Sequence, residues 1–430
     1  MLKDLLSRKS INRLLPPNKT AHIEKLLDGC GSIYVGFDAT YSSLHLGHLS
    51  LIIAANILVR ETNIERARPN ILYIIGENTA VLKNILDFKN PANVANIIND
   101  YSSSLSKQIN HIQKNISAMY NNRNAINILH NSKFFGNSQD SSNRVSDIYK
   151  NVSLREIKSL NILSGDQDDH HISDLVYPCH QALDWLYLKE NYNCSIQIGG
   201  SDQEGNIGIG MKALKRMRGY QLAGITTKLI DNKSGQKIGK TFTRSDNYSR
   251  TFASPFVDNP YSLYQYIMRI PDYLLEDYFY QLTFMDHDCI LKVLKDHKEP
   301  SSNFYAQKIL ANQILRICFS DKIAEEINQI IYSLLNGKIN DELSENPQEI
   351  LSKIKQYLPK YKIILDSNES FDKLQHKLNQ KSNNNHIILF IVFLDIYIKG
   401  KRIDKEIIKS RGENLIKVGG SDFAILEVAK

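Results

Sequence analysis

The sequence predicts an α/β protein built on a Rossmann-like parallel sheet. Short, β-branched apolar runs at 33–35, 71–75 and 195–198 have the length and composition of buried strands. Apolar stretches of helical length lie between them, at 49–59 and 176–188. Strands that alternate with helices form parallel sheets, because each helix carries the chain back to the start of the next strand.

The order of patterns along the chain predicts three domains. A sheet domain is expected over 1–258, with a helical insertion at about 100–170 where Asn, Ser, Lys and Gln dominate. Helical spacing of apolar residues predicts an α-helical domain over 259–345. A small α+β domain is expected over 346–430, with strands around 396–402, 415–420 and 423–428 and a Gly-Gly turn between the last two.

The composition restricts the class of function. The chain has 53 basic and 46 acidic side chains, a mild excess that permits contact with nucleic acid without requiring it. Five scattered cysteines without a CxxC pair predict neither a zinc site nor a disulfide framework. The segment 166–171 has the residue types of a metal site, but we interpret it as a polar loop. The longest apolar run, 387–398, is too short to cross a bilayer.

The segment 33–49, IYVGFDATYSSLHLGHL, combines a strand, a turn at Gly36 and the start of a helix at His45. Such an arrangement binds anions, because unpaired backbone N–H groups and the helix dipole point at the bound group. His45 and His48 can donate hydrogen bonds to phosphate, and Gly47 lets a nucleotide lie close to the backbone. An HxGH tetrapeptide alone is also compatible with a strand-turn-helix unit that contains incidental histidines.

The whole 17-residue string closely resembles the signature of class I tyrosyl-tRNA synthetases of the bacterial and organellar type. In that family a HIGH-like motif follows the strand that carries a tyrosine-binding Tyr, which is Tyr34 here. The resemblance implies contacts of Thr40 and His45 with the γ-phosphate of ATP, and of His48 and Asp38 with the nucleotide. The catalytic candidates of this segment are therefore Thr40, His45 and His48, and its ATP-binding candidates are Gly36, Asp38 and Gly47.

A second cluster lies on the helix VYPCHQALDWLYL. Tyr177, Gln181 and Asp184 are spaced by four and three residues, which places them on one helical face. A polar face that pairs with neighbouring lysines is the alternative interpretation. In the family this face is half of the tyrosine pocket. The resemblance implies that Asp184 and Tyr34 bind the phenol, while Tyr177 and Gln181 bind the α-amino group.

A third cluster is the block QIGGSDQEGN at 197–206. Two glycines after an apolar strand allow close backbone approach, and a following acid can accept hydrogen bonds from ribose hydroxyls. Two glycines also form simple turns, but the whole block is characteristic of the family. Gln197 is expected near the tyrosine, and Gly199, Asp202 and Gln203 near the adenylate. Glu204 stands where bacterial members usually have Trp.

A fourth cluster, KIGKT, resembles the KMSKS-type loop of the family. Lys237 and Lys240 are expected to stabilise the departing pyrophosphate, and Thr241 to contribute to ATP binding. Taken alone, these lysines favour a solvated loop, but their position after the GGSDQ block favours the family motif. One site departs from the family: Asn84 stands near the position of the Asp that binds the tyrosine ammonium, so either Asp87 or Glu77 serves instead or that contact is weakened.

The resemblance implies a tyrosine–tRNA ligase with L-tyrosine, ATP with Mg²⁺ as a substrate complex, and tRNA(Tyr) as substrates. It implies no tightly bound cofactor, a homodimer, no membrane partner, an anticodon-binding helical domain and an RNA-binding C-terminal module. Alternatives are another HxGH nucleotidyltransferase, such as a tryptophan-type synthetase, or an additional role in binding intron RNA, as in some fungal mitochondrial relatives.

The cellular compartment is expected to be the mitochondrial matrix, because a bacterial-type synthetase with a strong Ile, Asn and Lys bias is typical of an organellar enzyme. The cytoplasm of an AT-rich bacterium is the alternative. Residues 1–20 are basic, amphipathic and nearly free of acids, as in a transit peptide. We instead expect a first helix of the mature domain, ended by Pro16 and Pro17, since family members usually begin with a similar helix.

Overall fold

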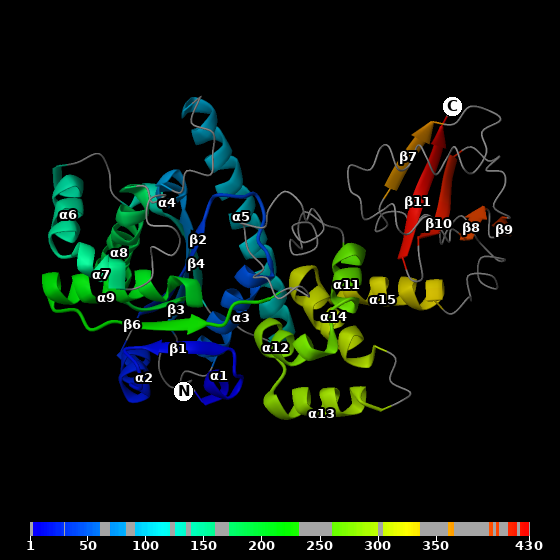
Figure 1. Cartoon of the computed structure of the whole chain (residues 1–430), viewed down its shortest axis with the longest axis horizontal. Helices are drawn as coiled ribbons and strands as arrows, with labels where there is room; N and C mark the ends of the chain where they lie inside the picture. Colours follow the sequence, from blue (N-terminus) through cyan, green and yellow to red (C-terminus); the bar gives the residue numbers. More distant parts are fainter. Residues whose placement is uncertain are drawn as a thin grey trace. The chain divides into compact units, whose positions relative to one another are not determined.

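A computed structural model of the chain gives the arrangement of these elements (Figure 1). The structure describes residues 3–29, 31–60, 69–82, 91–120, 125–134, 139–159, 172–231, 260–299, 304–335, 360–364, 395–398, 401–403, 412–418 and 422–429. The described residues divide into two compact units, one formed by 1–242 with 270–310 and the other by 243–269 with 311–430.

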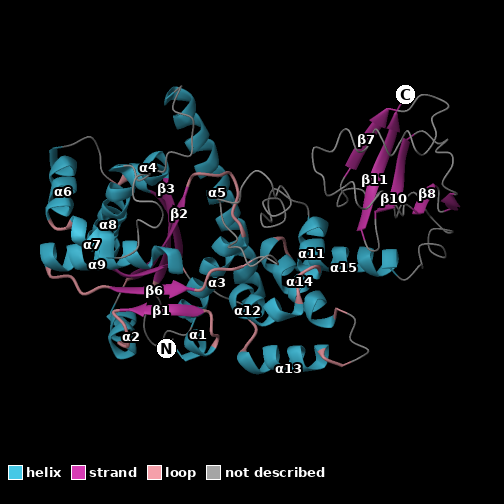
Figure 2. Ribbon diagram, in the orientation of Figure 1, coloured by secondary structure: helices cyan, strands magenta, loops and turns pink. Residues whose placement is uncertain are grey.

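The first unit is built on a six-stranded sheet with the order β1-β6-β5-β2-β3-β4. All neighbouring strands are parallel except β1, which pairs antiparallel with β6 at the edge. The strands are β1 (Ile11–Leu15), β2 (Ser32–Asp38), β3 (Asn70–Gly76), β4 (Ile126–His130), β5 (Cys194–Gly200) and β6 (Ala223–Thr227). The predicted Rossmann-like α/β class is confirmed (Figure 2).

The order in which strands are added to this sheet reverses at β2. From β2 the chain proceeds to β3 and β4 on one side, and then returns to place β5 and β6 on the other side of β2. The two connections that leave β2 and β5 therefore diverge, which opens a crevice at the carboxyl ends of these strands. Ligands of open α/β sheets bind at such a switch point.

Helices cover both faces of the sheet. Successive strand residues point to opposite faces, so strands that are apolar throughout present apolar side chains on both. Tyr34, Leu72 and Ile74 point to one face, where they form a core with α8 (Ile172–Tyr192) and α9 (Glu204–Arg218). On the other face, the Tyr73 hydroxyl contacts the side chains of Asn56 and Gln113. These belong to α3 (Leu46–Arg60) and α5 (Pro91–Tyr120). The strands and helices predicted between 33 and 198 are confirmed.

The remaining helices of the sheet unit are shorter. They are α1 (Lys3–Ser7), α2 (Thr20–Gly29), α4 (Glu77–Leu82), α6 (Gln139–Lys150), α7 (Leu154–Ser159), α12 (Asp272–Leu282) and α13 (His287–His297). Helix α3 is buried along almost its whole length, because α1 and α12 cover the side that does not face the sheet. The sheet unit thus includes residues from beyond 258.

The expected first helix is only partly correct. Helix α1 ends at Ser7, and Ile11–Leu15 form strand β1. The strand forms because residues 11–15 complete the exposed edge of β6, with Leu14 opposite Ile225. Between the two elements, the fully buried Arg8 donates hydrogen bonds to the carbonyl oxygens of Tyr280, Thr283 and Met285, which ties residues 3–15 into the fold.

The expected helical insertion also contains a strand. Ile126–His130 form β4, which pairs parallel with β3 at the far edge of the sheet. The prediction missed it because the apolar residues of β4 are few and lie in an Asn-rich region. The helices that flank it, α5 and α6, agree with the predicted helical character. Residues 160–171, including the polar segment at 166–171, lie outside the described residues.

The second unit contains α11 (Pro260–Met268), α15 (Asp321–Leu335) and a five-stranded sheet; α14 (Tyr305–Cys318) begins in the first unit and ends in this one. The order of this sheet is β7-β11-β10-β8-β9, and only β7 and β11 are parallel neighbours. Its strands are β7 (Lys360–Ile364), β8 (Asp395–Ile398), β9 (Lys401–Ile403), β10 (Gly412–Val418) and β11 (Asp422–Ala429). The strands predicted around 415–420 and 423–428 correspond to β10 and β11, whereas the segment predicted as a strand around 396–402 forms two antiparallel strands, β8 and β9. The boundaries 1–258, 259–345 and 346–430 stay predictions.

Candidate active site

A cavity of about 300 Å³ lies where β2, β3, β5 and β6 end. It occupies the switch point between β2 and β5, as expected for a ligand site of this topology. The cavity gathers residues from all of the predicted clusters that fall within the described chain. The predicted residues that line it are Tyr34, Gly36, Asp38, His45, Gly47, His48, Tyr177, Gln181, Asp184, Gln197, Gly199, Asp202 and Gln203.

The two histidines of the HLGH motif lie at the start of α3. Their rings are stacked with centroids 3.6 Å apart, and the His45 backbone N–H donates to Nδ1 of His48 at 3.2 Å. Because Nδ1 accepts this bond, the proton of a neutral His48 ring lies on Nε2. The edge contact with Phe37, at 5.3 Å between centroids, holds the ring in place. His48 therefore offers an oriented donor to the cavity.

Tyr34 and Asp184 form a buried part of the cavity wall. Tyr34 is 3% exposed and Asp184 is 7% exposed. Asn131 donates from Nδ2 to Oδ2 of Asp184 at 3.0 Å. Burial raises the pKa of Asp184 to about 7, although the bond from Asn131 opposes this shift. Burial also raises the pKa of Tyr34 well above its usual value, and the charge of Asp184 adds to it. A protonated Tyr34 hydroxyl and a carboxyl group that ionises at about pH 7 thus line the same buried part of the cavity.

Asp38 is held by two hydroxyl groups at the end of β2. The Tyr177 hydroxyl donates to Oδ2 at 3.0 Å, and Thr79 Oγ1 donates to Oδ1 at 2.7 Å. Gly76 makes this arrangement possible, since a Cβ atom there would lie 2.7 Å from Asp38 Oδ1 and 2.3 Å from Thr79 Oγ1. Asp38 and Gln181 both line the cavity.

Several buried polar atoms of the cavity wall have no hydrogen-bond partner among the described residues. Among them are Gln181 Oε1, Gln197 Oε1 and Thr227 Oγ1. Burying such a group without a partner costs about 1–3 kcal/mol, so these atoms are suited to a polar ligand. The cavity is therefore built for a molecule with several hydrogen-bonding groups.

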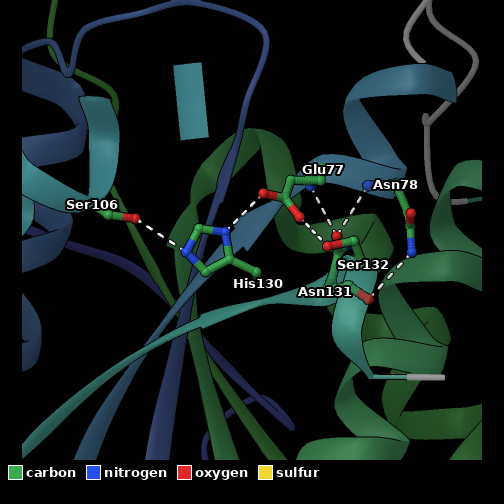
Figure 3. A network of polar contacts seen from close by, with 6 residues as sticks. All are labelled: Glu77, Asn78, Ser106, His130, Asn131 and Ser132. Atoms are coloured by element: carbon green, nitrogen blue, oxygen red, sulfur yellow. Dashed lines mark hydrogen bonds and ion pairs between the residues drawn. The ribbon is translucent and has the colours of Figure 1, made fainter. Parts of the chain in front are cut away.

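Glu77 does not line the cavity. Its carboxylate contacts Nδ1 of His130 at 2.7 Å and accepts a hydrogen bond from the Ser132 hydroxyl (Figure 3). The hydrogen bonds from Ser132 and His130 lower the pKa of Glu77 against the opposing effect of burial, which keeps it ionised. Glu77 is thus engaged by its own neighbours, whereas Asn84 and Asp87 lie outside the described residues.

Some predicted residues lie elsewhere. Thr40 is buried beside the cavity but does not line it, and its backbone N–H donates to the Asp38 carbonyl at 2.8 Å. Lys237, Lys240 and Thr241 lie outside the described residues.

The sequence interpretation missed several residues of the site. Asn131 and Thr79 hold the two carboxylates Asp184 and Asp38, and the segment 227–230 after β6 lines the cavity. The segment 227–230 could have been found from its position, because it follows a β-branched strand of a parallel sheet. No motif marks Asn131, which follows the strand that was missed.

A family model described as tRNA synthetases class I (W and Y) matches residues 30–336. The match covers most of the chain and all of the strands that form the cavity. The chain belongs to this family.

Individual relatives of this synthetase agree with the assignment. It is 28% identical over 442 residues to the tyrosine–tRNA ligase of Wigglesworthia glossinidia brevipalpis, an alignment that covers 99% of this chain and 98% of the relative. It is 22% identical to the mitochondrial tyrosine–tRNA ligase of Drosophila melanogaster, covering 99% and 94%. These relatives confirm the predicted resemblance to bacterial and organellar members.

A solved structure supports the fold of the synthetase. A C-terminally truncated mitochondrial tyrosyl-tRNA synthetase from Coccidioides posadasii matches with a TM-score of 0.58 and 21% identity, over 76% of this chain and 90% of that one. Class I synthetases use ATP, so a nucleotide is one expected occupant of the cavity. The described residues contain no cluster of three or more His, Cys, Asp or Glu side chains able to hold a metal ion. No helix in the described ranges is long and apolar enough to span a membrane.

Proposed function

We propose that this synthetase is a tyrosine–tRNA ligase. It joins L-tyrosine to ATP, with Mg²⁺ as part of the substrate complex, and then transfers the tyrosyl group to the 3′ end of tRNA(Tyr). A carboxylate oxygen of tyrosine attacks the α-phosphorus, the bond to the β-phosphate bridge breaks, and tyrosyl-adenylate and pyrophosphate form. A ribose hydroxyl of the tRNA then attacks the acyl carbon and releases AMP.

The observation that carries this proposal is that Tyr34 and Asp184 are both buried and both line the cavity, with the charge of Asp184 acting on the Tyr34 hydroxyl. A phenol hydroxyl can donate to the Asp184 carboxylate and accept from the Tyr34 hydroxyl. Phenylalanine would leave both of these buried groups without a partner, which is the physical basis for rejecting it. The names of the relatives agree with a tyrosine substrate.

The α-amino group of the substrate is bound at the Asp38 side of the cavity. The Tyr177 hydroxyl, the unpartnered Oε1 of Gln181 and the Asp38 carboxylate are its candidate partners. An ammonium group needs a negative charge nearby when it is removed from water. Asp38 is the cavity-lining carboxylate that contacts the Tyr177 hydroxyl, so we assign the counter-charge to Asp38 rather than to Glu77.

The nucleotide lies across the glycines and the HLGH motif. Gly199 and Gly200 let it approach the end of β5, and Asp202 accepts hydrogen bonds from the ribose hydroxyls. His45 and His48, at the start of α3, stabilise the phosphates together with the helix dipole. By resemblance, Lys237 and Lys240 neutralise the pyrophosphate as its charge grows. No side chain acts as a nucleophile, so catalysis is positioning and charge stabilisation.

Assembly and compartment are proposed from the family resemblance and from the names of the relatives. The proposal includes a homodimer in which one tRNA(Tyr) contacts both subunits, as the resemblance implies. It also places the protein in the mitochondrial matrix, supported by the Drosophila relative, whose name includes mitochondrial. The bacterial relative leaves a bacterial cytoplasm as the alternative.

The test is ATP–pyrophosphate exchange with the purified chain and tyrosine, phenylalanine or tryptophan. Exchange with tyrosine alone is expected. Exchange with tryptophan in its place would overturn the assignment of Tyr34 and Asp184 and favour a tryptophan-type enzyme. Absence of exchange with any of the three would overturn the proposed reaction.

A further inference from the structure

We propose that Glu77, His130 and Ser132 form a clamp that positions Asn131 and, through it, the Asp184 carboxylate that selects tyrosine over phenylalanine. The proposal rests on the proposed function and adds residues to it that contact no substrate. Figure 3 shows the clamp and its neighbours.

The clamp stands at the carboxyl ends of two adjacent parallel strands. Ile75 of β3 is opposite His130 of β4, so the residues that follow each strand lie side by side. After β3 the chain starts helix α4 at Glu77, and after β4 it enters a short 3₁₀ turn at Asn131–Lys133. A contact between these two segments therefore fixes the end of β4 relative to the end of β3.

The Glu77 carboxylate bridges both neighbours of Asn131. It contacts Nδ1 of His130 at 2.7 Å on one side and accepts a hydrogen bond from the Ser132 hydroxyl on the other. Nε2 of His130 contacts Ser106 Oγ of α5 at 3.3 Å, which anchors the ring from the opposite direction. His130 and Ser132, on either side of Asn131, are thus both held by Glu77, whose side chain is only 12% exposed.

Asn131 is oriented by this arrangement. It is 1% exposed, and its Oδ1 accepts hydrogen bonds from the backbone N–H groups of Glu77, at 2.8 Å, and Asn78, at 3.0 Å. The Asn78 side chain also donates to the Asn131 carbonyl at 3.2 Å. Because both acceptor positions of Oδ1 are used, the amide is not free to flip, and Nδ2 must face Asp184.

The consequence is a fixed position for the group that recognises the phenol. Asn131 donates from Nδ2 to Oδ2 of Asp184 at 3.0 Å, so the carboxylate keeps one orientation. Removing the clamp frees the 131–133 turn, and the carboxylate then has to be reordered when tyrosine binds. Phenylalanine makes no use of this carboxylate, so the loss affects tyrosine selectively.

The experiment compares Glu77→Ala with wild type in pyrophosphate exchange with tyrosine and with phenylalanine. The ratio of kcat/KM for tyrosine over phenylalanine is expected to fall about tenfold, the effect of losing about one hydrogen bond, with KM for ATP unchanged. The matched control is Glu156→Ala. Glu156 also contacts a serine, Ser153, and a basic side chain, Arg216, and its side chain is 16% exposed, but it lies on α7, away from the cavity lining. This control is expected to leave the ratio unchanged.

An equal loss with both amino acids would overturn the proposal, because a direct contact with the shared ammonium group or general destabilisation produces that result. An unchanged ratio would overturn it as well. If Glu77→Ala does not fold, Ser132→Ala is measured in its place. This variant removes only the hydrogen bond from Ser132 to Glu77, and the same ratio of kcat/KM for tyrosine over phenylalanine is compared with wild type. If the wild type catalyses exchange with tyrosine but the variants leave the ratio unchanged, the proposed function stands and the clamp is rejected. Failure of the wild type to catalyse exchange would instead reject the proposed function.

Discussion

Replacing Asp184 by asparagine is expected to stabilise the free protein at pH 8 while it impairs tyrosine activation. Asp184 is 7% exposed, and the one hydrogen bond that it accepts from the described residues, from Asn131, does not compensate for the loss of water around a charge. Burial therefore raises its pKa from 3.8 to about 7. Asparagine has nearly the same shape and can still accept the bond from Asn131 through its own Oδ1, but it carries no charge.

The magnitude follows from the difference in pKa between the folded and unfolded chain. Each pKa unit is worth about 1.4 kcal/mol, so ionised Asp184 destabilises the folded state by about 4 kcal/mol above pH 7. Between pH 3.8 and 7 the folded chain binds more protons than the unfolded chain, so stability falls as pH rises through this window and is constant above it. The stabilisation by asparagine is therefore expected to be about 4 kcal/mol at pH 8 and about 2 kcal/mol at pH 5.

The assay is urea unfolding of wild type and Asp184→Asn at pH 5 and pH 8, combined with pyrophosphate exchange. Activity with tyrosine is expected to fall about 10- to 150-fold, because a hydrogen bond to a charged group contributes about 1.5–3 kcal/mol. The control is Glu156→Gln, which has the opposite sign: Arg216 lowers the pKa of Glu156 to about 2, so neutralising it weakens the fold at pH 8. A stabilisation by Asp184→Asn that is absent at pH 8, or equal at both pH values, would refute the reasoning.

Three further substitutions test other parts of the structure. His45→Ala is expected to lower the rate of adenylate formation at least about tenfold and to leave tyrosine affinity nearly intact, since the proposed function assigns this ring to the phosphates; unchanged exchange turnover would contradict this role. Gly76→Ala places a methyl group within 2.7 Å of Asp38 Oδ1 and 2.3 Å of Thr79 Oγ1. It should cost about 1–3 kcal/mol in urea unfolding and raise KM for tyrosine, and a variant with normal values of both would show that Asp38 tolerates displacement. Arg8→Met removes three hydrogen bonds to backbone carbonyls near the end of α12, and the free energy of unfolding should fall by about 2–4 kcal/mol. A fall below about 0.5 kcal/mol, as for a surface change, would argue against this anchoring role.

The sequence predicted the core of the sheet and most of the cavity wall. This was possible because the residues of the site lie in short motifs next to strongly apolar strands, such as Tyr34 in β2 and Gln197 in β5. An apolar strand is recognisable by itself, and a glycine with a polar residue at its end indicates the ligand edge. These motifs are far apart in the sequence, and they meet in space because parallel strands place their carboxyl ends at the same edge of the sheet.

The errors have a common physical cause. Ile11–Leu15 and Ile126–His130 are edge strands, β1 and β4, and each is stabilised mainly by the neighbour it pairs with rather than by its own pattern. Short edge strands carry few buried side chains, so their periodicity is weak. The failure to predict β4 also hid Asn131, because a residue can be placed at the end of a strand only after the strand has been recognised.

The position of Asn131 shows how selectivity depends on residues beyond the recognisable motifs. Asp184 was found from its helix, but a buried carboxylate at a fixed place needs a donor that the helix does not supply. The donor is Asn131, directly after β4, which β2 and β3 separate from β5, and the backbone N–H of Glu77, directly after β3, helps to hold it. A relative that keeps Tyr34 and Asp184 but lacks a comparable support at the end of β4 should therefore activate tyrosine with lower selectivity. Substituting Asn131→Ala in this chain should reproduce that state, with a larger fall in the tyrosine-to-phenylalanine ratio than Glu77→Ala produces.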